Sequence, residues 1–176
     1  MRPRRSQPLV LFSLLVALSA CAASTSRNAG LIVGPKPERL AFTRVLELLP
    51  RDFDTPIVVI DPEAVPDSSA VARLDAFTVQ EPDGTLRQKI YLNRDSLVLR
   101  EAAQGRDFFL KVLAAIIVHE AAHLSGASEA DARRAESGFF AGLLARGLVN
   151  PEDGERYLAV LRSRPGSVGE QIRQGP

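Results

Sequence analysis

Hydrophobic positions recur with two different periods between residues 38 and 164. A spacing of three to four residues is typical of amphipathic helices, whereas alternation or a short unbroken apolar run is typical of strands. The helical spacing predicts helices over residues 38–49, 95–104, 108–124, 128–147 and 151–162. Few positions of residues 108–124 are polar, so we expect this helix to be buried on most of its sides.

The remaining hydrophobic segments are short and predict strands. Residues 56–60 form a β-branched run that suits a buried strand. Residues 74–80 and 85–93 flank the turn sequence Pro82-Asp83-Gly84 and predict a hairpin. We therefore expect an α+β domain with a short antiparallel sheet, in which the 108–124 helix packs against the helix that follows it.

The first 21 residues have the organisation of a secretory signal peptide. Arginines precede an apolar run of about ten residues, which is too short to span a bilayer. The run ends in Leu18-Ser19-Ala20-Cys21, which resembles the bacterial lipobox. This resemblance implies that Cys21 is lipidated and anchors the chain to a membrane, and Ala22, in place of an aspartate, implies the outer membrane facing the periplasm. The alternative is a conventionally cleaved signal with Cys21 as an ordinary residue.

Composition divides the rest of the chain into three parts. Residues 22–37 are small and polar, with Pro35 and Pro37, and predict a flexible linker. Residues 38–164 are long enough for one domain with a single core. Residues 165–176 are rich in Gly, Gln and Pro and predict a frayed tail.

Charge and cysteine content exclude several functions. The chain has 22 Lys and Arg against 21 Asp and Glu, with no basic run beyond its first five residues, so nucleic-acid binding is not expected. Cys21 is the only cysteine, which excludes an intramolecular disulfide and a metal site built from thiolates.

The chemistry is concentrated in His119-Glu120-Ala121-Ala122-His123, an HExxH sequence that contains both histidines of the chain. Residues four apart on a helix share a face, so both imidazoles can bind one metal ion while Glu120 faces a metal-bound water. Zinc acidifies such a water and polarises a carbonyl, and the carboxylate accepts the proton. Two histidines and a glutamate without a partner such as a metal would be costly in an apolar helix.

This motif, the strand and hairpin before it and the helix after it resemble the zincin metallopeptidases over residues 58–144. The resemblance implies a zinc-dependent hydrolase that acts on a peptide or protein, with zinc held by His119 and His123 and water activated by Glu120. A catalytic zinc needs a third protein ligand. Because no other histidine and no available cysteine remains, that ligand is expected to be a carboxylate.

Glu129 is the first candidate for this third ligand. It lies six residues after His123 with Gly126 midway, a spacing similar to that of the metzincins, although the only methionine is Met1 and their Met-turn is absent. A glutamate ligand on the following helix resembles the gluzincins instead. Glu136 is the alternative ligand, and favourable charge at a helix N-terminus is the structural alternative for Glu129.

The sequence also offers candidates for supporting roles. Gluzincins often carry an Asp four residues after the glutamate ligand, where this chain has Arg133, so Asp131 is the candidate to hydrogen-bond a histidine instead. Candidate donors to the developing oxyanion are Tyr157, Tyr91 and Arg133. Residues 89–93 are a candidate edge strand for pairing with an extended peptide.

Two other functions stay open at this point. A non-catalytic lipoprotein could use a zincin-like fold to bind zinc structurally or to hold a partner, although the intact Glu120 favours catalysis. A hydrolase of another amide, for example in cell-wall peptide, would use the same residues.

Overall fold

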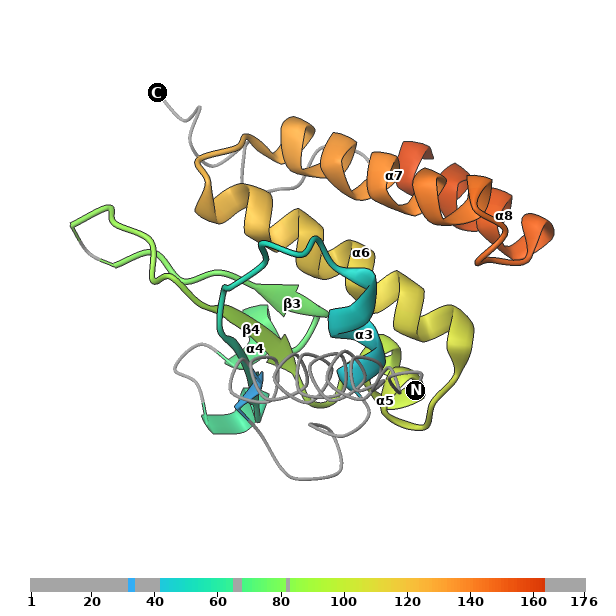
Figure 1. Cartoon of the computed structure of the whole chain (residues 1–176). Coiled ribbons are helices and arrows are strands. Elements are labelled where there is room, and N and C mark those ends of the chain that lie inside the picture. The colour runs from blue at the N-terminus through green and yellow to red at the C-terminus, as the bar shows by residue number, and fades with distance from the viewer. Residues whose placement is uncertain (1–31, 34–41, 65–67, 82, 164–176) are drawn as a thin grey trace, which may run out of the picture.

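The computed structural model describes residues 32–33, 42–64, 68–81 and 83–163 (Figure 1). Their elements, in chain order, are β1 (Ile32–Val33), α3 (Thr43–Leu48), β2 (Ile57–Ile60), the 3-10 turn η1 (Pro62–Ala64), α4 (Ser68–Val71), β3 (Ala76–Phe77), β4 (Ile90–Asn93), α5 (Leu97–Ala103), α6 (Asp107–Leu124), α7 (Glu129–Ala145) and α8 (Pro151–Ser163). The α+β class predicted from the sequence is confirmed.

The N-terminal segments of the sequence fall mostly outside these residues. The signal peptide, residues 1–21, and the tail, residues 165–176, lie outside the described part of the chain. Ile32 and Val33, which the composition assigned to the linker 22–37, form β1 and pair with β2. The sheet therefore begins before residue 38, because two hydrophobic residues are enough to add a short parallel strand. Within the described residues no helix is both long and apolar enough to cross a bilayer.

The sheet has the strand order β1-β2-β4-β3 and is mixed. The predicted hairpin is confirmed, because β3 and β4 pair antiparallel with Phe77 opposite Tyr91. The expected antiparallel pairing is only part of the sheet, since β2 runs parallel to β4 and Val58 lies opposite Tyr91. Residues 61–89, which include β3, separate these two strands and provide the crossover that parallel pairing requires.

This order also corrects the position of the edge strand. β4 lies between β2 and β3, so residues 89–93 do not form an edge of the sheet. Among the described strands, β3 forms the edge of the sheet next to β4, and β1 forms the opposite edge. Beyond β3 the hairpin continues as an arm that projects away from the helices (Figure 1), closed by hydrogen bonds between Glu81 N and Thr85 O at 2.7 Å and between Gly84 N and Glu81 O at 2.9 Å. Gly84 has a φ of 86°, which favours glycine at this turn.

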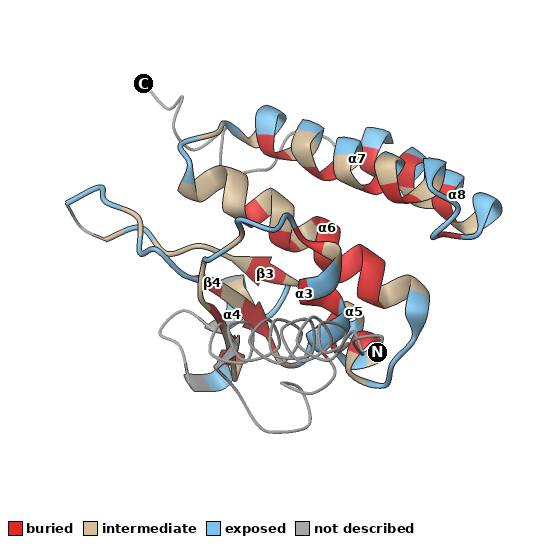
Figure 2. Ribbon diagram, viewed as in Figure 1, coloured by how far each residue is buried: buried red, intermediate tan, exposed pale blue. Residues whose placement is uncertain are grey.

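α6 lies between the sheet and the pair α7 and α8 (Figure 1) and is buried on both of these sides (Figure 2). Leu110, Leu113 and Ile117 pack with α3, α5 and the strands in one core. Val112 and Ala115 pack with Phe140, Leu143 and residues of α8 in a second core. Full burial of a leucine-sized side chain contributes about 1.5–3 kcal/mol, so these two cores hold α6 in a defined rotation.

The connection between α6 and α7 brings two polar segments together. Gly126, with a φ of 86°, follows the C-terminal end of α6, as the sequence predicted. Ser128 caps α7, and its hydroxyl accepts a hydrogen bond from Asp131 N at 3.2 Å. With so short a connection, the first residue of α7, Glu129, lies beside the last turn of α6, where the HExxH motif ends.

Candidate metal centre

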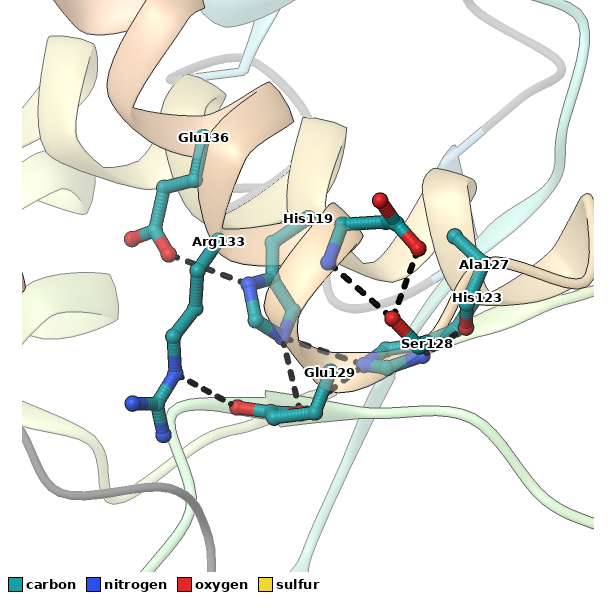
Figure 3. A network of polar contacts seen from close by, with 8 residues as sticks. His119, His123, Ala127, Ser128, Glu129, Arg133 and Glu136 are labelled. Carbon is teal, nitrogen blue, oxygen red and sulfur yellow. Dashed lines mark hydrogen bonds and ion pairs between the residues drawn. The ribbon is translucent and has the colours of Figure 1, made fainter.

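The two histidines of α6 point their Nε2 atoms at each other, 3.2 Å apart (Figure 3). Their Nδ1 atoms face other partners. His119 Nδ1 lies 3.0 Å from Glu136 Oε2, and His123 Nδ1 lies 3.1 Å from the Ala127 carbonyl oxygen. A carboxylate and a carbonyl can only accept, so each Nδ1 carries the hydrogen. In its neutral form each ring therefore keeps the Nε2 lone pair that a metal would use.

Glu129 brings a third donor to the same point. Its Oε2 atom lies 3.2 Å from His123 Nε2 and 3.6 Å from His119 Nε2. Ligands at about 2.0–2.1 Å from a tetrahedral zinc ion are separated from one another by about 3.3 Å, which is close to all three separations here. Among the described residues, these three form the one group of side chains placed so that they could hold a metal ion. The donor set therefore fits zinc with three protein ligands.

The two carboxylate oxygens of Glu136 do not face the Nε2 atoms of the histidines, as a metal ligand would. It is 4% exposed, and its Oε1 accepts a hydrogen bond from the Tyr157 hydroxyl at 2.7 Å while Oε2 binds His119 Nδ1. Glu136 thus holds His119 from the ring nitrogen remote from the other donors, as carboxylates commonly do for metal-binding histidines. Glu129, and not the alternative Glu136, is grouped with the two Nε2 atoms.

The role proposed from sequence for Asp131 is wrong. Asp131 is exposed, and it bonds Ser128 at the start of α7 and forms an ion pair with Arg134. The residue that hydrogen-bonds a histidine is Glu136, one and a half helical turns further on. A sequence signal for it existed: Glu136 lies seven residues after Glu129, which puts both on one face of α7.

Glu120 lies in the same cavity as these donors and is only 8% exposed. Burial raises the pKa of its carboxyl group; the neighbouring histidines oppose this shift, and the negative charges of Glu129 and Glu136 add to it. None of the described residues donates a hydrogen bond to this carboxylate. Glu120 is therefore a buried acid whose oxygens accept no hydrogen bond from the described part of the chain, which suits a general base.

The electrostatics of the cluster favour a positive charge between its members. Burial by itself would lower the pKa of His119, but the hydrogen bond and charge of Glu136, together with Glu120 and Glu129, outweigh it and raise the pKa. Burial would raise the pKa of Glu129, but the hydrogen bond from Arg133 and the nearby cationic groups lower it. Without metal, the site attracts a proton to the place where a divalent cation would lie.

The three candidate oxyanion donors lie in different surroundings. Arg133 lines the cavity and donates from Nε to Glu129 Oε1 at 2.8 Å. Tyr157 donates to Glu136, and the ring of Tyr91 stacks on Phe77 with centroids 5.5 Å apart. Neither tyrosine lines the cavity, so Arg133 alone of the three lies at the site.

The cavity has a volume of about 830 Å³, within the range of small-ligand and peptide pockets. One wall is formed by the HExxH residues and by the first turns of α7. The opposite wall is formed by β3 and the hairpin arm, with Ala76, Phe77, Thr78, Gln80 and Leu86. The candidate metal centre thus opens onto a groove beside the edge strand.

Comparison with known proteins adds no relative. No protein-family model matches the chain, and no curated protein or solved structure is significantly similar to it. The function is therefore argued from the fold and the geometry of the site.

Proposed function

We propose that this chain is a zinc-dependent hydrolase, a metallopeptidase of the gluzincin-like kind, in which Glu120 activates water for attack on a peptide carbonyl. One observation carries the proposal: His119 Nε2, His123 Nε2 and Glu129 Oε2 converge at the separations of zinc ligands, beside a buried Glu120 in one cavity. The Nε2 lone pairs of two neutral imidazoles and the negative charge of a carboxylate repel one another in this arrangement unless a cation lies among them.

Each residue of the site has a separate role in the proposed reaction. When bound, zinc polarises the substrate carbonyl and acidifies water. His119 and His123 present Nε2 because their Nδ1 hydrogens are held by Glu136 and by Ala127 O. Glu120 takes a proton from the attacking water and passes it to the amine nitrogen as the carbon–nitrogen bond breaks. Its raised pKa brings the protonated form nearer to neutral pH, which suits a group that must both accept and return a proton.

A peptide substrate is supported by the edge of the sheet. Asn93 N donates to Asp75 O at 3.0 Å, and Ala76 lies opposite Leu92 in the next, non-bonded position of the antiparallel ladder. By this alternation the backbone groups of Ala76 and Thr78 point away from β4, toward the cavity that both residues line. An extended peptide can add to β3 as a further strand, with its carbonyl carbon near the histidines.

The proposal is tested by measuring the zinc content of the chain and the effect of replacing Glu120. The purified chain is expected to hold about one zinc ion, measured by elemental analysis, and to cleave a quenched fluorescent peptide library. Glu120→Gln should keep the zinc and lose the cleavage, whereas Glu47→Gln, at an exposed position of α3, should change neither. Replacement of both histidines by alanine should abolish zinc binding.

Three results would contradict the proposal in different ways. Zinc retained after loss of both histidines would show that the metal lies elsewhere. Cleavage that survives in Glu120→Gln would remove Glu120 as the base. Zinc binding without cleavage of any peptide would favour a non-catalytic zinc-binding lipoprotein or a hydrolase of another amide, the latter tested with cell-wall peptide.

We also propose that the enzyme is tethered through a lipid on Cys21 to the outer membrane, facing the periplasm. The support is the lipobox-like sequence Leu18-Ser19-Ala20-Cys21 after a short apolar run. Labelling of cells with an alkyne fatty acid should mark the chain, and Cys21→Ser should lose both the label and the membrane association. A Cys21→Ser chain that stays labelled would exclude this anchor.

A further inference from the structure

We propose that Arg133 is a positioning residue that occupies one oxygen of Glu129, so that Glu129 binds the metal through its other oxygen alone. This inference rests on the proposed function. Arg133 Nε donates to Glu129 Oε1 at 2.8 Å, while Oε2 of the same carboxylate is the atom 3.2 Å from His123 Nε2 (Figure 3). The two oxygens of Glu129 therefore have separate partners.

The arrangement follows from the helical repeat of α7. Glu129, Arg133 and Glu136 are spaced by four and three residues, so they lie on one face of α7, the face turned toward the histidines of α6. Glu129 Oε2 lies beside His123 Nε2, Glu136 accepts a hydrogen bond from His119 Nδ1, and Arg133 donates one to Glu129 Oε1. Arg133 and Glu129 have side chains only 21% and 20% exposed, so their contact is better shielded from water than a surface ion pair.

The consequence concerns the number of ligand atoms. A catalytic zinc site has three protein ligand atoms and leaves a position open for water. A carboxylate with two unoccupied oxygens can supply both, and the second would then join the three protein atoms and the water as a fifth ligand. A charge-assisted hydrogen bond from the guanidinium to Oε1 opposes this second contact.

Coordination number can be measured without any assay of hydrolysis. Cobalt(II) substitutes for zinc in such sites, and its visible absorption weakens as ligands are added beyond four. We would record the cobalt spectrum of the full chain and of Arg133→Met, Arg133→Lys and Arg134→Met, with cobalt content measured on the same samples. Arg134 is the matched control, because it is the neighbouring arginine of α7 but pairs with Asp131, away from the histidines.

We expect the wild-type chain and Arg134→Met to give the same intense spectrum. Arg133→Met should give weaker bands at shorter wavelength, because Oε1 is released to join the metal. Arg133→Lys should recover part of the intensity, since an ammonium group can also donate to Oε1. Should Arg133→Met not fold, as judged by circular dichroism, Arg133→Ala removes the donor with the residue that favours a helix most and is expected to show the same loss.

Different results overturn different statements. An Arg133→Met spectrum identical to that of the wild-type chain at equal cobalt content would refute the role of Arg133 and leave the proposed function standing. A lysine variant that resembles the methionine variant would refute the part played by the donated hydrogen bond. A wild-type chain that binds no cobalt would overturn both the inference and the metal site on which it rests.

Discussion

Glu136 provides the sharpest quantitative prediction, because it is almost fully buried and bonds His119 at Nδ1, the ring nitrogen remote from Glu129 and His123. Its carboxylate accepts one hydrogen bond from His119 Nδ1 at 3.0 Å and one from Tyr157 at 2.7 Å, at a position that is 4% exposed. Replacement by alanine removes both acceptors. His119 then has no carboxylate to hold its Nδ1 hydrogen, and its ring is free to rotate or to move the hydrogen to Nε2.

The magnitude follows from these contacts. Loss of a group that orients a metal-bound histidine typically weakens metal binding by about 10–100-fold, which is about 1.4–2.8 kcal/mol. Glu136→Ala should fall in this range. Glu136→Gln should lose less, because its amide oxygen can still accept from His119 while its amide nitrogen donates to the oxygen of Tyr157. Tyr157→Phe leaves the contact between Glu136 and His119 intact and should have the smallest effect.

The assay is competition for zinc between the chain and a chromophoric chelator. Asp131→Asn is the matched control, since Asp131 lies on the same helix but bonds only Ser128 and Arg134 among the contacts found for it. Its zinc affinity should equal that of the wild-type chain. Equal losses in Asp131→Asn and Glu136→Ala, or no loss in Glu136→Ala, would refute the assignment of the histidine's carboxylate partner.

Three further predictions concern pH and local structure. The pKa of His119 is raised, so protons should compete with zinc as the pH falls through that raised value, and affinity that held until well below the ordinary 6.5 would contradict this. In the zinc-free chain, Glu120→Gln should raise the thermal midpoint at neutral pH, because burial raises the pKa of Glu120 and its ionised carboxylate then lowers stability. The gain should vanish below pH 4.5, the ordinary pKa of glutamate, where Glu120 is protonated in both the folded and the unfolded chain. A gain that persisted in acid would have another cause. Ser128→Ala should cost about 0.5–2 kcal/mol in denaturant unfolding and also weaken zinc binding, because it loosens the turn that carries Glu129, whereas Ser128→Thr should be close to the wild-type chain.

The helices and the HExxH motif could be read from the sequence because they depend on neighbours along the chain. The period of the apolar residues placed α6 within one residue of its observed start, and Ser128 marked the start of α7. The spacing of His119 and His123 by one turn, and the glycine that reverses the chain before Glu129, are equally local. These features required no knowledge of which distant segments meet.

Interactions between segments far apart in the chain could not be read in the same way. β2 and β4 pair in parallel across some thirty intervening residues, and this puts β3, not residues 89–93, at the edge beside the cavity. Likewise, nothing in the local pattern around Tyr157 indicates that α8 delivers its hydroxyl to Glu136.

Local geometry along the chain identifies the residues that could form a metal site: helical periodicity puts both imidazoles on one face, and a short capped connection returns a glutamate to them. The use of each atom depends on how the helices pack. The packing of α7 against α6 places Oε2 of Glu129 beside the histidines and Glu136 beside Nδ1 of His119, while Oε1 of Glu129 accepts a hydrogen bond from Arg133. The physical reason is that a backbone repeat specifies the direction of a side chain, whereas its partner depends on the burial of apolar surface between helices, which sets their separation and rotation.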